Sequence, residues 1–367
     1  HGPVPLILGG KRTFGYVTRF AQSNLTWEKA ISSNAGVELG FFNNELTFGV
    51  DWFLKRNNDL LAPLEPLPSS GQTIVINQGD VPYYNTASVE NKGWEFVFGY
   101  RKGWGDFTLD MQGNITFLKN KVRALGEGVQ PIRGIQLSSK FGDRATITKE
   151  GLPIGTFWGY EVTGMDGEGN FLIKGADGTD KSITKANETD KRVIGNPTPD
   201  FTYGLNINLG YKNWDLTAFF QGTQGNDLFA AAKYQYYFNY TNNNLTDALN
   251  SWTPTNTNTT VPIAKTDNSV GGNSLPSSFY VEDGSYFRCK NLQIGYSFSD
   301  KLLRKTGFIS SARIYAGVQN LFTITKYSLY DPEVSDNTLF DRGCDGIENR
   351  APSINARVYN IGFNLTF

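Results

Sequence analysis

In the last eleven residues of the chain, RVYNIGFNLTF, two kinds of side chain alternate strictly from Tyr359 onward. Small or polar side chains fill one parity, and large apolar side chains fill the other: Tyr359, Ile361, Phe363, Leu365 and Phe367. Successive side chains of an extended strand point to opposite faces. The chain therefore ends in a predicted strand whose two faces have very different surroundings.

The same alternation recurs along most of the chain. It is clear in GWEFVFGYR (93–101), DFTLDMQGNITF (106–117) and DFTYGLNINLGY (200–211). About twelve strands are predicted, near 11–20, 30–42, 45–58, 88–101, 105–120, 142–150, 154–163, 200–211, 214–227, 285–299, 309–323 and 353–367. Many exceed the five or six residues usual in soluble proteins, and no amphipathic helix of useful length is predicted.

The predicted connections alternate between short and long. Short connections lie at 42–45, 101–106, 150–154 and 211–214, with a somewhat longer one at 300–308. Long connections lie at 59–87, 121–141, 164–199, 228–284 and 324–352. Short turns at one end and long loops at the other are typical of an outer-membrane barrel, with periplasmic turns and extracellular loops.

A soluble β-sandwich would also show alternating strands, because its inner faces are apolar and its outer faces are solvated. The polar parity here carries Asn, Gly, Thr, Gln and Ser instead of the Lys and Glu usual on solvated faces. Aromatic residues mark both ends of strands, as Trp94 with Tyr100 and Phe201 with Tyr211 show. Such positions are typical of the aromatic girdles of a membrane barrel. The sequence therefore favours an all-β, antiparallel transmembrane barrel.

This fold predicts which side chains face lipid and which face the lumen. The expected lipid-facing residues include Phe96, Phe98, Leu205, Ile207, Phe363 and Leu365. The expected inward residues include Asn206, Asn208, Asn364 and Thr366.

The histidine count and the charge balance argue against His-dependent enzymes, His-rich metal sites and nucleic-acid-binding proteins. The one histidine is His1, so His-based triads and His-rich metal sites cannot form within the chain. Lys plus Arg number 34 and Asp plus Glu number 35, which leaves no positive charge excess for binding nucleic acid. No nucleophile can be paired with a base from the sequence. We expect no enzymatic activity, no nucleic-acid partner and no cofactor.

Eight stretches of the chain, taken in order, point to one family. They are NLTWEKA (24–30), LGFFNNELTFGVDWFLKRNNDLL (39–61), ASVENKGWEFVFGY (87–100), LPIGTFWGYEVTG (152–164), IGNPTPDFTYGLNINLGYKNWDLTAFFQGTQGNDLF (194–229), YVEDGSYFRCKNLQIGYSF (280–298), GVQNLFTITKYSLYDPEV (317–334) and the closing strand. In these residues the chain resembles the C-terminal part of the SusC/RagA family of TonB-dependent outer-membrane transporters. The resemblance runs from near residue 24 to the end.

The resemblance implies a barrel of 22 strands, of which twelve would be about half. Family members begin with a TonB-contacting region and a plug domain, and neither is found in this sequence. A half-barrel would leave two unpaired strand edges in lipid, which is not viable. We expect residues 1–367 to be the C-terminal part of a receptor barrel, completed by another barrel segment and a plug.

The resemblance further implies energised uptake across the bacterial outer membrane. A SusD-like surface lipoprotein would hold the substrate against the barrel, and TonB would act through the missing N-terminal part. Relatives carry oligosaccharides or peptides, and either substrate remains open here. A passive porin or structural barrel, and a soluble carbohydrate-binding sandwich, are the alternatives. The long loops 228–284 and 324–352 are expected to contact the lipoprotein, and the barrel surface to contact outer-membrane lipid.

Clustered aromatic residues in the loop 228–284 are the best candidates for ligand contact: Tyr234, Tyr236, Tyr237, Tyr240 and Trp252. Aromatic rings can stack on sugars or pack against peptide side chains with few torsions to freeze. The alternative is that the loop folds on itself or packs on a partner subunit. Asn226 and Asp227 could hydrogen-bond a ligand at the rim, or could simply end their strand.

Two further features of the sequence concern a metal site and a disulfide. Many relatives carry a calcium-loop-like run before GNPTPDF, but GADGTDKSITKANETD lacks the dense oxygen ligands of such a site, so no bound metal is expected. Cys289 and Cys344 both fall near the extracellular side, where an oxidising environment permits a disulfide. Two unpaired thiols remain the alternative, because the sequence gives no distance between them.

Overall fold

The computed structural model describes most of the chain in separate segments. The described residues are 25–63, 83–126, 129–134, 143–238, 245–264, 272–303, 307–333 and 355–367, together with the backbone of a short hairpin near the N-terminus. That hairpin pairs β1 (Val4–Leu8) with β2 (Lys11–Gly15).

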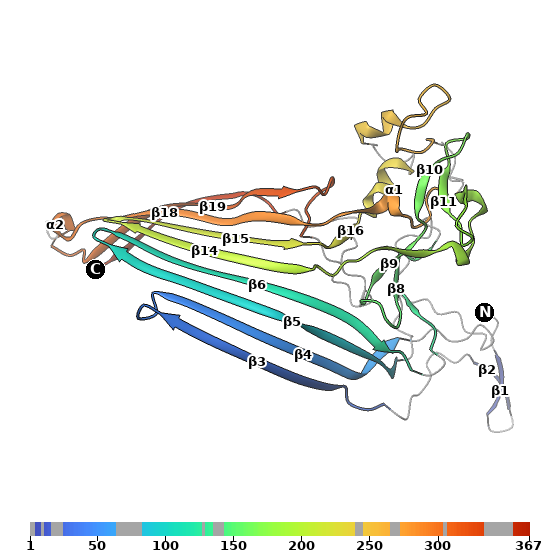
Figure 1. Cartoon of the computed structure of the whole chain (residues 1–367), viewed down its shortest axis with the longest axis horizontal. Coiled ribbons are helices and arrows are strands. Elements are labelled where there is room, and N and C mark those ends of the chain that lie inside the picture. The colour runs from blue at the N-terminus through green and yellow to red at the C-terminus, as the bar shows by residue number, and fades with distance from the viewer. Residues whose placement is uncertain are drawn as a thin grey trace.

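Nine strands form one antiparallel sheet whose order follows the chain, each strand pairing with the next (Figure 1). They are β3 (Lys29–Phe41), β4 (Leu46–Pro63), β5 (Tyr83–Trp104), β6 (Phe107–Ala124), β14 (Phe201–Tyr211), β15 (Trp214–Gln224), β18 (Tyr286–Ser297), β19 (Ser311–Thr325) and β20 (Val358–Thr366). Among the described residues, no strand pairs with the outer edge of β3 or of β20. The sheet is an open barrel wall, which confirms the predicted fold class.

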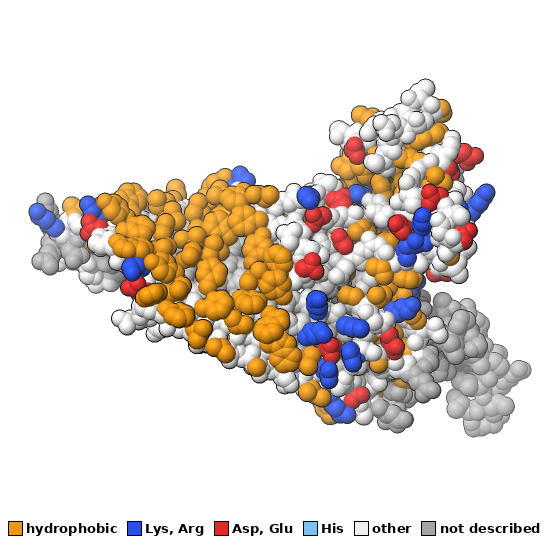
Figure 2. Space-filling model, in the orientation of Figure 1, with side chains coloured by type: hydrophobic (Ala, Val, Ile, Leu, Met, Phe, Trp, Pro, Cys, Tyr) orange, Lys and Arg blue, Asp and Glu red, His pale blue; other side chains and the backbone are white. Residues whose placement is uncertain are grey.

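The apolar parity of the strands gathers on one face of this wall. Leu205 lies opposite Phe220, Phe96 opposite Ile115, and Phe363 opposite Ile314. Figure 2 shows this face as a continuous apolar belt over the strands. Phe363 is 73% exposed within the chain, as expected of a side chain whose neighbour is lipid.

The polar parity lies on the opposite face, as predicted. Asn206 lies opposite Gln112, and the Asn208 side chain accepts a hydrogen bond of 3.0 Å from Thr217. Asn364 lies opposite Arg313, and Thr366 opposite Ser311. Register therefore separates the two predicted sets of side chains completely.

Tight turns close the hairpins at one end of the wall. Phe42, Asn43 and Asn44 all have φ between 55° and 65° in the turn between β3 and β4. Asn tolerates this left-handed region because its short side chain can hydrogen-bond locally. Gly105, at φ 59°, makes the corresponding turn between β5 and β6. We call this end of the wall the turn end and the other the long-loop end.

Three of the twelve predicted strands lie outside the nine-stranded sheet. The predicted strands 142–150 and 154–163 correspond to β8 (Thr146–Thr148) and β9 (Thr156–Gly159), which belong to a separate small sheet. The strand predicted at 11–20 is described as far as Gly15, where it pairs with β1. Among the described residues the wall therefore has nine of the twelve predicted strands, and two of the other three belong to a domain outside the wall.

That domain, which we call the loop-end domain, consists of the described residues within 129–195 and 226–283. One of its sheets has the order β13 (Arg192–Gly195), β9, β8, β7 (Ile132–Arg133), and another the order β10 (Val162–Met165), β11 (Phe171–Lys174), β12 (Asp180–Ser182). A two-stranded sheet pairs β16 (Asp227–Phe229) with β17 (Val281–Asp283). Figure 1 shows this domain at the long-loop end of the wall.

The helices of the described residues are short. They are α1 (Ala232–Tyr237), α2 (Asp300–Leu303) and the 3-10 turns η3 (Ile183–Lys185), η4 (Glu188–Asp190), η5 (Thr246–Asn250) and η6 (Ser278–Tyr280). Within the described ranges, no helix has both the length and the apolar character needed to cross a membrane.

Candidate functional site

The loop-end domain is assembled from two connections that are distant in sequence. The backbone N–H of Tyr160 donates to the carbonyl of Pro276 at 2.9 Å, and Ser278 N–H donates back to Tyr160 at 2.9 Å. The Phe171 N–H donates to the side chain of Asn273 at 2.9 Å. These contacts lock the connection between β6 and β14 onto the connection between β15 and β18.

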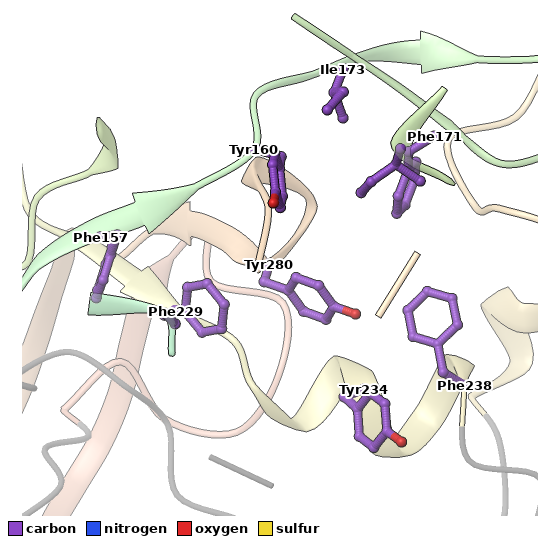
Figure 3. Packing of buried hydrophobic residues seen from close by; sticks show 10 residues of the cluster. Phe157, Tyr160, Phe171, Ile173, Phe229, Tyr234, Phe238 and Tyr280 are labelled. Atoms are coloured by element: carbon purple, nitrogen blue, oxygen red, sulfur yellow. The ribbon is translucent and has the colours of Figure 1, made fainter. Parts of the chain in front are cut away.

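An aromatic core holds the two connections together (Figure 3). Tyr280 is fully buried at its centre, with its ring 5.5 Å from that of Phe229 and 5.2 Å from that of Phe279. Its hydroxyl donates to the Asn273 carbonyl at 3.2 Å. Burial of this phenol raises its pKa well above the usual value, so the hydroxyl stays a neutral donor.

The predicted aromatic ligand residues of α1 divide between this core and its surface. Tyr234 is 5% exposed and belongs to the buried cluster. Tyr236 is half-buried with its ring 6.3 Å from that of Tyr330. Tyr237 is half-buried, donates to Asp247 at 2.9 Å and places its ring edge-on to Phe279. The ligand-contact hypothesis therefore depends on Tyr236 and Tyr237, and Tyr240 lies outside the described residues.

Trp252 joins the segment 245–264 to the hairpin of β10 and β11. Its side chain is 8% exposed, and its ring packs so closely on Gly169 that a Cβ there would lie 2.5 Å from it. Gly169 has φ 76°, a conformation that favours glycine. The Ile263 N–H donates to the Gly169 carbonyl at 3.0 Å. Through these contacts the loop packs on itself.

Asn226 and Asp227 lie where β15 gives way to the loop-end domain. Asn226 is 8% exposed; its side chain accepts from Thr223 at 2.9 Å, and its carbonyl accepts from Gly284 N–H at 2.8 Å. The Asp227 carboxylate accepts from the Asn196 N–H at 2.8 Å. Burial and the carboxylate of Asp283, its partner across the strands, raise the pKa of Asp227. Both residues thus close the junction, and a ligand role for them stays a prediction.

Charged pairs stabilise the side of the domain near η4. The Asp190 carboxylate is buried, pairs with Lys181 at 2.6 Å and accepts from the N–H groups of Asn187 and Ala176. Burial raises its pKa, but the Lys181 ammonium and the two amides outweigh that effect and hold the pKa below the usual value. Lys191, also buried, pairs with Asp143 and Glu188.

A buried arginine at the long-loop end of β18 is a feature that the sequence did not reveal. Arg288 is 1% exposed, pairs with Asp331 at 2.6 Å and with Glu333, and donates to Thr323 at 2.8 Å. Lys290 also pairs with Glu333, at 2.9 Å. The two carboxylates of the DPE run at 331–333 bind this arginine from a segment about 40 residues later in the chain, a pairing that no local pattern signals.

The structure does not test the predicted disulfide. Cys289 is a buried, free thiol among the described residues, and Cys344 lies outside them. The disulfide between them stays a prediction. In the described part of the chain, no three His, Cys, Asp or Glu side chains gather as a metal-binding group.

Comparison with known proteins agrees with this architecture. Residues 9–321 match the family described as "TonB dependent receptor-like, beta-barrel". The chain is 34% identical over 391 aligned positions to TonB-dependent receptor P3 of Formosa agariphila, covering 98% of this chain and 36% of that protein. It is 27% identical to TonB-dependent receptor SusC of Bacteroides thetaiotaomicron, covering 94% of this chain and 32% of SusC.

Solved structures share the fold. A structure of the RagAB peptide transporter superposes with a TM-score of 0.79 at 23% identity, covering 100% of this chain and 38% of that one. The RagAB peptide importer in its "closed-closed" state gives a TM-score of 0.77 at 23% identity, covering 100% of this chain and 39% of that one. The chain thus spans about a third of the length of the curated relatives it matches. It belongs to the TonB-dependent receptor β-barrel family, and its resemblance to the SusC/RagA transporters is confirmed.

Proposed function

We propose that this chain forms part of the barrel wall and the extracellular loops of a TonB-dependent nutrient transporter of the SusC type in a bacterial outer membrane. The observation that carries the proposal is the combination of an open nine-stranded wall, an apolar belt on one face, and a folded domain at the long-loop end. The family match and the names of the relatives support it. The wall would span the membrane, and the loop-end domain would meet the substrate outside the cell.

Other polypeptide would complete the barrel. The outer edges of β3 and β20 are unpaired among the described residues. In lipid, each unsatisfied backbone group costs several kcal/mol, so a few such groups would cancel a typical stability of about 5–15 kcal/mol. The remaining barrel strands and a plug would pair with these edges and fill the lumen, and TonB would act through the plug.

The substrate would be an oligosaccharide or a peptide, delivered with a SusD-like lipoprotein. Leu249, in η5, is 90% exposed at the surface of the loop-end domain. Single exposed apolar side chains are common on protein surfaces, so Leu249 serves as an accessible probe position and not as evidence of docking. Leu249 lies within the loop expected to contact the lipoprotein.

A crosslinking experiment tests the partner. A photoreactive residue at Leu249 of the full-length protein should capture a surface lipoprotein in intact cells. The matched control places the same group at Trp104, which is 46% exposed at the turn end of β5 and should give no such product. Equal yields at both positions, or none at Leu249, would contradict the docking proposal.

An uptake experiment tests energised transport. Deleting the TonB-contacting segment from the full-length protein should abolish uptake of oligosaccharide or peptide while the protein remains in the outer membrane. Uptake at an unchanged rate would instead support the passive-porin alternative.

A further inference from the structure

Five cations lie on the apolar face of the wall, next to its long-loop end. They are Arg56 of β4, Lys92 of β5, and Lys119, Lys121 and Arg123 of β6, and we call them the basic patch. All five are exposed. Figure 2 shows basic side chains grouped beside the apolar belt, over the part of the wall that Figure 1 assigns to β4, β5 and β6.

Strand register places the patch directly beyond an aromatic row of the belt. In that row Trp94 lies opposite Trp52 on one side and Phe117 on the other. Lys92 and Lys119 lie opposite each other two residues farther along the same strands. Two residues keep the same face and advance about 7 Å. Aromatic girdles lie where the apolar core of a bilayer meets its headgroups, so the patch lies at headgroup level.

The patch carries more positive charge than the protein itself neutralises. Its one carboxylate is Glu90, which pairs with Arg56 at 2.9 Å and lies 4.0 Å from Arg123. Among the described residues, Lys92, Lys119 and Lys121 have no acidic side chain within salt-bridge distance. At the turn end of the same strands, by contrast, Lys102 pairs with Glu45 at 2.7 Å.

We propose that the basic patch binds the phosphate groups of a lipid headgroup in the outer leaflet. Lysine and arginine donate charge-assisted hydrogen bonds to phosphate oxygens, and basic clusters at a membrane surface attract anionic lipids. The acyl chains of the same molecule would lie along the belt beside Trp94 and Phe117. A phosphorylated lipid therefore matches both the charge and the apolar surface, and it would fix the depth of this side of the wall. The inference depends on the membrane-barrel fold and is independent of transport.

The test uses the full-length protein purified in detergent, with lipid binding measured by native mass spectrometry. The probe is diphosphoryl lipid A, compared with its dephosphorylated form and with inorganic phosphate. The triple variant Lys92→Gln, Lys119→Gln, Lys121→Gln should bind the phosphorylated lipid at least about ten-fold more weakly than the wild type. Binding to the wild type should also weaken with added salt, because exposed charges are screened.

Two control variants keep the test decisive. Lys174→Gln, Lys185→Gln, Lys326→Gln removes the same charge from the extracellular loops and should bind lipid A as the wild type does. Replacing the three patch lysines by arginine keeps the charge and should keep lipid A binding, which separates an effect of charge from an effect on folding.

Three results would overturn the inference. It would be overturned if the glutamine triple bound lipid A as tightly as the wild type does, or if the wild type bound the dephosphorylated lipid as tightly as lipid A. Binding of inorganic phosphate as strong as that of lipid A would also overturn it. Unchanged substrate uptake by the triple would leave the proposed transport function intact.

Discussion

Aromatic side chains are exposed in the wall and buried in the loop-end domain, although both regions are built from antiparallel strands. Phe363 in β20 is 73% exposed, whereas Phe229 in β16 is fully buried. The wall turns its apolar face to lipid, so its interior can be polar. The loop-end domain lies in water and must bury its rings in a core of its own. The surrounding medium, lipid or water, therefore decides whether the aromatic side chains of a strand are exposed or buried.

Removing a ring from the loop-end core should have the largest effect on stability. Phe229→Ala deletes a fully buried ring packed between Phe157 and Tyr280. Phe-to-Ala changes in cores cost about 3–5 kcal/mol, so limited proteolysis should cut this domain far faster while the wall stays intact. Leu249→Ala, at a side chain that is 90% exposed, is the control and should leave the cleavage rate unchanged. Simultaneous loss of the wall would show that the two regions are one cooperative unit.

A charge placed on the apolar face of a wall strand should destabilise the protein more than the same charge on the polar face. Leu205→Arg puts a cation in the middle of the apolar belt, and Asn206→Arg puts it on the opposite face. A lipid-facing arginine at the bilayer midplane costs about 2–4 kcal/mol, whereas a lumenal one costs much less. Urea unfolding of the full-length protein from lipid vesicles measures both. Equal losses for the two variants would show that the faces are wrongly assigned.

The ion pair at η4 should make the loop-end domain sensitive to acid. The pKa of Asp190 is lower in the folded domain than the ordinary value of 3.8. The ionised carboxylate therefore stabilises the folded domain at pH values above 3.8, and this stabilisation is lost as the pH falls through the pKa of the folded state. Asp190→Asn should cost about 1.5–3 kcal/mol at neutral pH, measured by proteolysis of the domain. The difference from the wild type should shrink as the pH falls below about 4. A constant difference at all pH values would exclude this titration as its cause.

Removing one hydroxyl should have the smallest effect and separate packing from recognition. Tyr237→Phe loses the hydrogen bond to Asp247 but keeps the ring on Phe279, and should cost about 0.5–1.5 kcal/mol. Tyr236→Ala, at the half-buried ring near Tyr330, should instead weaken substrate binding to the full-length protein. If neither variant changes substrate affinity, α1 has only a structural role.

The alternation of residues in the sequence was sufficient to predict the wall. A side-chain period of two fixes which residues share a face. The sequence therefore predicts the lipid-facing set with Phe363 and Leu365 and the inward set with Asn364 and Thr366. Strands β4, β5 and β6 run longer than predicted, and β5 covers Tyr83–Trp104 where 88–101 was expected, whereas β15 and β18 end earlier than predicted. Strand ends are hard to predict because pairing beyond the membrane needs no alternation.

The tertiary structure decided what lies outside the wall. Residues 142–150 and 154–163 were expected to be wall strands, and only the pairing of β8 and β9 with β7 and β13 assigns them to the loop-end domain. Local pattern could not tell that Tyr234 would be buried and Tyr236 half-buried, because both lie on one short helix whose packing depends on residues near 160 and 280. The pairing of Arg288 with Asp331 is likewise a contact over 43 residues. Sequence determines faces through a local period, whereas burial and pairing between distant segments depend on how the whole chain folds.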